Sequence, residues 1–289
     1  RLFYQEGWHY SFDEEGNPSY SGIVFNEMQG KYASPEMICF YAVMKTLFPD
    51  STYRLNSGGN PLAIPNLTYE QFLDFHRRYY HPCNSYIYLY GNCDMQERLL
   101  YLDREYLSKY ERIDIDSSIL PQEAFSAPKS DVSEYPVAVG DDVENNTYFC
   151  ENFVVGSILD PALYQAFSVL DYALLNSPGA PLREALMKKG IGKDITGGYS
   201  NGTLQPYFSV GVKGAKPSDK ERFDSTLFDA IQSVIENGID KKSLKAAINI
   251  QEFNFREADF GAYPKGLVYG LICLDSWIYD DSKPFLHLN

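Results

Sequence analysis

The sequence predicts an α+β protein in which an antiparallel sheet is covered by helices on one face. Apolar residues recur at three- and four-residue spacing in several segments that open on capping residues, which is typical of amphipathic helices. Residues 192–214 contain two strand patterns joined at Asn201-Gly202, a strong hairpin signal. Predicted strands and helices do not alternate strictly, and this favours an antiparallel sheet over a parallel α/β fold.

The first part of the chain is predicted to be mostly helical, with one short strand. Ser34 followed by Pro35 is an N-cap and first-turn signal, and Thr68 with Gln71 forms a capping box. The predicted elements are helices over 22–32, 35–48, 69–80 and 95–110, the last capped by Asp94, a loop over 54–66 and a strand over 85–91.

The second part begins after a stretch without periodicity. We predict a first domain over 1–112, a linker over 113–130 and a second domain over 131–289, because 289 residues exceed one average domain. The second domain is predicted to contain a strand near Pro136, a strand over 147–156, the hairpin over 192–214, and helices over 161–175, 181–190, 220–238 (capped by Ser218 with Glu221), 240–260 and 266–279.

Composition restricts the partners. The net charge of −14 repels phosphate backbones, so we expect no nucleic-acid and no anionic membrane partner, whereas basic peptides are compatible. The same charge also serves plain solubility. Five scattered cysteines without a C-x-x-C pair favour a reducing compartment, and no apolar run has membrane-spanning length, so we expect a cytoplasmic protein.

Common catalytic motifs are absent from the sequence. Neither H-E-x-x-H nor H-x-x-E-H occurs, and no nucleophile elbow, phosphate loop or dinucleotide fingerprint is present. His76 and His81 are five residues apart and do not share a helical face, so we interpret both as structural. No catalytic residue is assigned in this chain.

Glu27 is the acid that calls for explanation. Helical spacing places it on one side with Val24, Met28 and Lys31, in apolar surroundings. A buried carboxylate is costly without a cation, a metal or several donors, so we expect Glu27 to have a partner elsewhere.

The glycine pair in the segment 194–199 has two interpretations. It is either part of an ordinary hairpin or part of an edge strand that is open to an extended peptide, because missing side chains let a second backbone approach.

Several stretches together resemble the insulinase/pitrilysin-type zinc metallopeptidases, in their presequence-protease branch. They are "GIVFNEMQGKYASPE", "LFPDSTYRLNSGGNPLAIPNLTYEQFLDFHRRYYHPCNSYIYLYGN", "PGAPLREALMKKGIGKDITGGY" and "FREADFGAYPKGLVYGL". The resemblance implies metallopeptidase-like domains, with 1–112 as the C-terminal part of the catalytic domain and 131–289 as a nearly complete, non-catalytic second domain.

The resemblance also implies specific residue roles. Glu27 matches the distal glutamate that serves as third zinc ligand, while the H-x-x-E-H segment that supplies two histidines and the general base is expected before Arg1. The intact parent would therefore use zinc, and this chain alone would bind none. In the second domain, the match suggests that Ile195, Thr196, Gly197 and Gly198 bind a peptide by strand addition.

We therefore interpret the chain as an internal piece of a zinc-dependent endopeptidase that degrades unfolded peptides, inactive by itself. Its expected partners are peptides, possibly basic ones, and the missing N-terminal segment and C-terminal half of the parent. Two alternatives stay open: a non-catalytic peptide-binding or scaffold module of the same fold, and a metal-free enzyme that uses Glu27 as a general acid.

Overall fold

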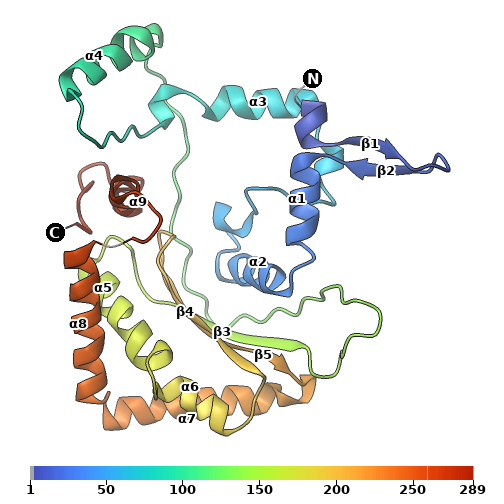
Figure 1. Ribbon diagram of the computed structural model, residues 1–289, viewed down its shortest axis with the longest axis vertical. Helices are drawn as coiled ribbons and strands as arrows, with labels where there is room; N and C mark the ends of the chain where they lie inside the picture. The colour runs from blue at the N-terminus through green and yellow to red at the C-terminus, as the bar shows by residue number, and fades with distance from the viewer. Residues whose placement is uncertain (1–2, 259, 289) are drawn as a thin grey trace. The chain divides into compact units, whose positions relative to one another are not determined.

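The chain forms two compact units, Arg1–Pro136 and Val137–Asn289 (Figure 1). The structure is a computed structural model that describes residues 3–258 and 260–288. Both units combine helices with antiparallel strands, so the predicted α+β class is confirmed. Within the described residues, no helix has the length and apolar character that a membrane crossing requires.

The first unit is built from a hairpin and four α-helices. A π-helical turn, Phe3–Gly7, precedes the hairpin of β1 and β2, whose strands pair from His9 opposite Ser21 to Phe12 opposite Pro18. The elements are β1 (His9–Phe12), β2 (Pro18–Ser21), α1 (Ile23–Lys31), α2 (Pro35–Leu47), α3 (Tyr69–Tyr79) and α4 (Met95–Glu105).

Two strand assignments in this unit differ from expectation. The hairpin of β1 and β2 was not predicted, although Asp13 stabilises its turn by accepting from the backbone N–H of Asn17 at 2.8 Å. The predicted strand over 85–91 is wrong, because residues 85–90 carry no assigned helix or strand. Aromatic and branched residues favour extended backbone, but a strand forms only against a neighbouring strand.

The stretch predicted as a linker, 113–130, contains no helix or strand and belongs to the first unit. Gln122 binds this stretch to the first unit through hydrogen bonds to Asp50. Its side chain is 8% exposed, accepts from the backbone N–H of Asp50 at 2.9 Å and donates to the Asp50 carboxylate at 2.7 Å. The boundary between the compact units therefore follows Pro136. The predicted strand near Pro136 is absent as well.

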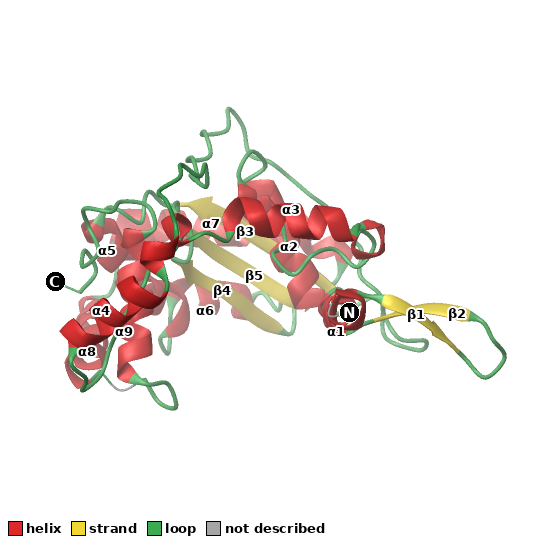
Figure 2. Ribbon diagram, turned by 90° about the horizontal axis from the view of Figure 1, so that it is seen from above, coloured by secondary structure: helices red, strands yellow, loops and turns green. Residues whose placement is uncertain are grey.

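A three-stranded antiparallel sheet of order β3-β5-β4 organises the second unit, with β5 in the middle (Figure 2). The pairing runs from Asp194 opposite Lys213 to Ser200 opposite Tyr207 on one side of β5. Six residues, 201–206, connect β4 to β5, so the connection is longer than the two-residue turn expected at Asn201-Gly202. The strands are β3 (Thr147–Val154), β4 (Asp194–Ser200) and β5 (Tyr207–Ala215).

Helices cover one face of this sheet, as predicted (Figure 1). Alternate residues of β5, Phe208, Val210 and Val212, pack with the buried side chains of α6 and α7, because successive strand residues point to opposite faces. The helices are α5 (Pro161–Asp171), continued by a π-helical turn (Tyr172–Asn176), α6 (Pro181–Lys188), α7 (Lys220–Asn237), α8 (Lys241–Glu257) and α9 (Lys265–Trp277).

Most predicted helix starts are confirmed by side-chain caps. The N-cap side chains that accept from the first turn are Ser34, Thr68, Asp94, Asp160 and Asp240. The cap predicted at Ser218 is wrong. Residues Pro217–Asp219 form a 3₁₀ turn, and α7 starts after it without a side-chain cap.

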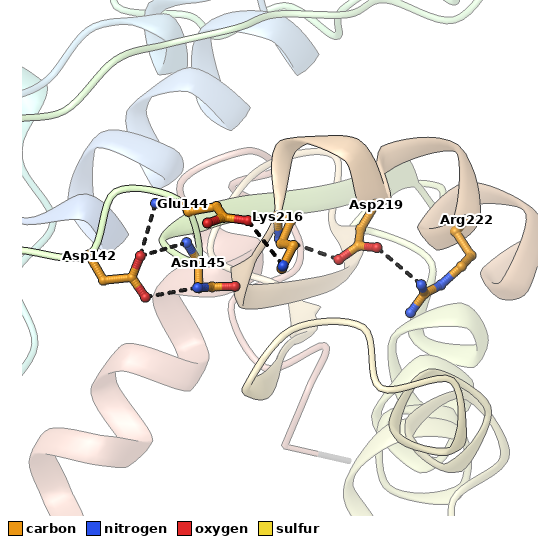
Figure 3. Close-up of polar contacts among 6 residues, drawn as sticks. All are labelled: Asp142, Glu144, Asn145, Lys216, Asp219 and Arg222. Atoms are coloured by element: carbon orange, nitrogen blue, oxygen red, sulfur yellow. Dashed lines mark hydrogen bonds and ion pairs between the residues drawn. The ribbon is translucent and has the colours of Figure 1, made fainter.

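Polar contacts join the loop before β3 to the corner between β5 and α7 (Figure 3). Asp142 accepts from the backbone N–H of Glu144, whose carboxylate lies 3.1 Å from the Lys216 ammonium. The Lys216 backbone N–H donates to Asp219, and Asp219 pairs with Arg222 at 3.2 Å. Exposed ion pairs contribute little each, so this network orients the corner more than it stabilises the fold.

Replacement of Phe223 tests the core. Its ring is fully buried in α7 and stacks on Phe149 at 5.7 Å, so Phe223→Ala should lower the free energy of unfolding by about 3–5 kcal/mol. Ile235→Ala on the same helix, at a side chain 71% exposed, should change it by less than about 0.5 kcal/mol. Urea denaturation followed by circular dichroism measures both; equal effects would contradict the proposed core.

Candidate functional site

Glu27 lies on the exposed side of α1. Phe25 and Met28 are buried against Ile64, which turns Glu27 outward, with 57% of its side chain exposed. Its carboxylate forms an ion pair with Lys31, four residues on, at 2.7 Å. The expectation of an acid in apolar surroundings is therefore wrong, because the buried face of α1 is set by Phe25 and Met28, and the partner was already present within the helix.

The ion pair between Glu27 and Lys31 shifts the pKa of the lysine. The hydrogen bond that Lys31 donates to the Glu27 carboxylate, together with the negative charge of Glu27, raises the pKa of Lys31. Both groups are exposed, and such i,i+4 pairs stabilise a helix only slightly.

The donors present do not make a zinc site. A catalytic zinc ion is held by three protein ligands and a water. No group of three His, Cys, Asp or Glu side chains that could hold a metal occurs in residues 3–258 and 260–288. Glu27 can offer one carboxylate, and the described part of the chain does not supply the others.

The two central histidines have structural contacts in the first unit. His76 stacks on Tyr80, with ring centroids 4.7 Å apart, and His81 accepts from the backbone N–H of Cys83 at 3.2 Å. His81 also packs edge-on against Tyr110. These contacts fit the structural interpretation.

The residues predicted to bind peptide, Ile195, Thr196, Gly197 and Gly198, lie in β4 at the edge of the sheet. Two contacts within the chain already use this strand. The Asp171 carboxylate accepts from the backbone N–H of Tyr199 at 2.9 Å, and Arg183 donates to the Ile195 carbonyl at 3.4 Å.

Gly197 is exposed between these two positions, whereas the Ile195 side chain is buried. A peptide that paired with β4 would therefore meet the backbone around Gly197 and Gly198.

Both glycines are required by the fold of this unit itself. Their φ angles are 116° at Gly197 and 142° at Gly198, in the region that side chains disfavour. A Cβ at Gly197 would lie 2.2 Å from the Ser209 carbonyl oxygen, and one at Gly198 would lie 2.8 Å from the Asp171 carboxylate. Internal packing thus accounts for the glycine pair without a ligand.

A polar cluster near the end of β4 was not predicted. Asp275 of α9 accepts a hydrogen bond from the Tyr164 hydroxyl of α5 at 3.5 Å, and Tyr164 packs edge-on against Tyr199 of β4. Burial raises the pKa of Asp275 to about 6, although the Tyr164 hydrogen bond opposes the shift. Burial and the Asp275 charge raise the pKa of Tyr199 to about 12.

The signal for this cluster was available in the sequence. Asp275 is the single acid in the apolar segment 266–279, the same kind of anomaly that drew attention to Glu27. A carboxylate in apolar surroundings needs a compensating partner, and here the environment of the acid is partly desolvated.

Alanine at Gly197 tests the close approach of β4 to β5. Gly197→Ala should destabilise the protein by about 2–4 kcal/mol, because the new Cβ meets backbone and φ stays positive. Gly202→Ala is the control, since nothing lies within 4 Å of its added Cβ, and it should change stability by less than about 1 kcal/mol. If urea denaturation shows Gly197→Ala to be as stable as the control, the strand geometry described here is wrong.

The pKa of Asp275 predicts a pH-dependent stability. Because its folded pKa is raised from 3.8 to about 6, the contribution of this group is favourable below about pH 4 and is lost as the pH rises through 6. Asp275→Asn should therefore match the parent near pH 4 and be more stable by about 1–2 kcal/mol above pH 7, after allowance for residual solvent contact.

Asp229→Asn is the matched control for this measurement, because Asp229 is exposed on α7. It should leave the pH profile of the unfolding free energy unchanged. A parent and an Asp275→Asn variant with superimposable profiles from pH 4 to 8 would contradict the desolvation of Asp275.

The chain is similar in sequence to two longer proteins. It is 45% identical over 288 residues to "Protein HypA" of Clostridium perfringens and 38% identical over 283 residues to "Presequence protease 1, chloroplastic/mitochondrial" of Arabidopsis thaliana. These alignments cover 99% and 96% of this chain but only 30% and 26% of the relatives. The chain thus spans less than a third of their length.

A solved structure shares the fold. The crystal structure of a peptidase M16 inactive domain from Pseudomonas fluorescens aligns with a TM-score of 0.63, covering 92% of this chain and 62% of the other at 18% identity. The family model described as the peptidase M16 inactive domain matches residues 66–251. The resemblance to insulinase-type and presequence peptidases is therefore confirmed, and the chain belongs to the M16 peptidase family.

Proposed function

We propose that this chain is a piece of a zinc-dependent endopeptidase that degrades unfolded peptides, and that it is inactive by itself. The observation that carries the proposal is the match of residues 66–251 to the M16 inactive domain, together with 38% identity to a protein named as a presequence protease. The chain by itself does not hydrolyse peptides, because a hydrolytic zinc site needs more ligands than Glu27 provides.

Glu27 serves the longer protein as one zinc ligand in this proposal. Its carboxylate is on an exposed helix face, and Lys31 neutralises it until a metal competes for it. Zinc, when bound, polarises the scissile carbonyl and makes bound water acidic enough to act as nucleophile. The other ligands and the general base come from residues outside this chain.

The second unit holds the peptide in this proposal. Backbone pairing along Ile195, Thr196, Gly197 and Gly198 adds a strand to the edge of β4, and the main-chain hydrogen bonds of this mode supply affinity whatever the peptide sequence. The chain's charge of −14 favours basic peptides by long-range attraction. No disulfide joins the five cysteines in the part of the chain that the structure describes, and on this ground we propose a cytoplasmic location.

A second candidate is a peptide-binding or scaffold module without hydrolytic activity in the longer protein. The match to an inactive domain favours it. The two candidates differ in whether the longer protein binds zinc through Glu27.

Two substitutions on one helix separate a zinc ligand from a surface ion pair. In the full-length protein, Glu27→Gln should weaken zinc binding roughly 100-fold or more, because removing even an outer-sphere partner costs 10- to 100-fold. Lys31→Met breaks the same ion pair but removes no ligand, so the zinc content should stay within about two-fold of the parent. Zinc per protein is measured by mass spectrometry after dialysis.

The outcomes decide between the candidates. Parallel zinc loss in both variants, or in neither, would reject Glu27 as a ligand and leave the peptide-binding module as the better account. Peptide cleavage that resists a chelator but is abolished by Glu27→Gln would instead indicate a metal-free enzyme with Glu27 as general acid.

A further inference from the structure

Asp275 is a half-buried carboxylate that has no cationic partner among the described residues. Among the residues that the structure describes, the carboxylate accepts from the Tyr164 hydroxyl at 3.5 Å, and no lysine or arginine contributes to its pKa. A carboxylate removed from water is costly unless a cation or several donors compensate it. The described residues therefore supply no cation that would compensate the burial of an ionised Asp275.

The titratable groups that the described residues place around Asp275 and its partner Tyr164 come from α5, β4 and the C-terminal segment. Tyr164 of α5 and Tyr199 of β4 are phenols whose pKa values are raised by burial and by the Asp275 charge. His287 stacks on the Tyr164 ring at 4.0 Å and is 5% exposed.

Burial lowers the pKa of His287, so its ring does not supply the missing charge. Within residues 3–258 and 260–288, neither ring nitrogen has a hydrogen-bond partner of ordinary geometry, although the Ile158 backbone lies close enough to favour the protonated form in part.

The surroundings of the carboxylate are aromatic. The Tyr199 ring stacks on Phe167 at 5.7 Å and meets Tyr164 edge-on at 6.4 Å. Aromatic faces attract ammonium and guanidinium groups, and a carboxylate beside them adds a charge-assisted hydrogen bond. One carboxylate is too few for a divalent metal, which takes several oxygen ligands. This chemistry therefore selects an organic cation.

The cluster adjoins the strand that we propose as the peptide-binding edge. Tyr199 follows Gly198 directly in β4, and its backbone N–H is bonded to Asp171. Side chains on neighbouring strands lie about 5 Å apart when they are opposite each other, and long side chains reach further. The Asp275 carboxylate, bonded to Tyr164, is linked through the Tyr164 and Tyr199 rings to the end of the strand along which the peptide would pair.

We propose that Asp275, Tyr164 and Tyr199 form a subsite for the ammonium or guanidinium group of a basic residue in a peptide bound along β4. The proposal that a cation binds here is based only on the geometry of the second unit. Its assignment to a peptide rests on the proposed function.

A pair of peptides tests the subsite in the intact chain. The first is an unstructured peptide with a single arginine, and the second is the same peptide with citrulline, which keeps the shape and removes the charge. The arginine peptide should bind about 10-fold more tightly, as one charge-assisted contact predicts. In Asp275→Asn the ratio should fall to about 1, while Asp229→Asn, with the same loss of charge, should keep it. Isothermal titration calorimetry measures the ratio.

A second measurement needs no variant and no peptide. Methylguanidinium added to the parent chain should lower the pKa of Asp275, because the cation binds the ionised form, whereas sodium chloride at equal ionic strength should not. Carbon-13 NMR of the carboxyl group follows this titration. No difference between methylguanidinium and sodium chloride would overturn the proposal, as would an arginine-to-citrulline ratio that Asp275→Asn leaves intact.

The results also separate this inference from the peptide-binding role. If both peptides bind equally well, the strand β4 holds peptides but the subsite is rejected. If methylguanidinium lowers the pKa of Asp275 and neither peptide binds, the cation site is supported and the assignment of β4 to peptides fails.

Discussion

The pairing of β5 between β3 and β4 is the constraint on which the second unit depends. Phe208, Val210 and Val212 point to one face of the central strand, and the helices bury that face. Because β5 is satisfied on both sides, β4 must lie at the edge. The position of β4 then determines where Gly197 approaches Ser209 and where Tyr199 meets the side chains of α5 and α9. Strand pairing thus places Tyr199, while α5 and α9 supply Tyr164 and Asp275.

The cost of burying a carboxylate explains the contrast between the two acids that matter here. Glu27 keeps most of its solvent contact and has a lysine one helical turn away, so its ionised form is compensated. Asp275 loses much of its water and gains only a phenol hydroxyl. The same physical rule underlies both proposals, a zinc ligand at Glu27 and a subsite for an organic cation at Asp275.

The chain corresponds to only a part of the longer relatives that it matches. The chain covers less than a third of HypA and of presequence protease 1, and its described residues hold no complete set of metal ligands. What they do hold is an open sheet edge, an acidic surface and a desolvated carboxylate beside that edge. These are the features on which the proposed peptide-binding role rests.

The sequence by itself determined the α+β class, the family and most helix starts. Caps such as Thr68 with Gln71, and Asp240, were predictable because the donor and acceptor lie within four residues of each other. Strand pairing and burial depend on residues far apart in the chain, so segment 85–91 was wrongly predicted as a strand and the hairpin of β1 and β2 was missed. Only the tertiary structure showed that Glu27 faces solvent and that Asp275 is desolvated, because the periodicity of one helix does not reveal what the rest of the protein places against it.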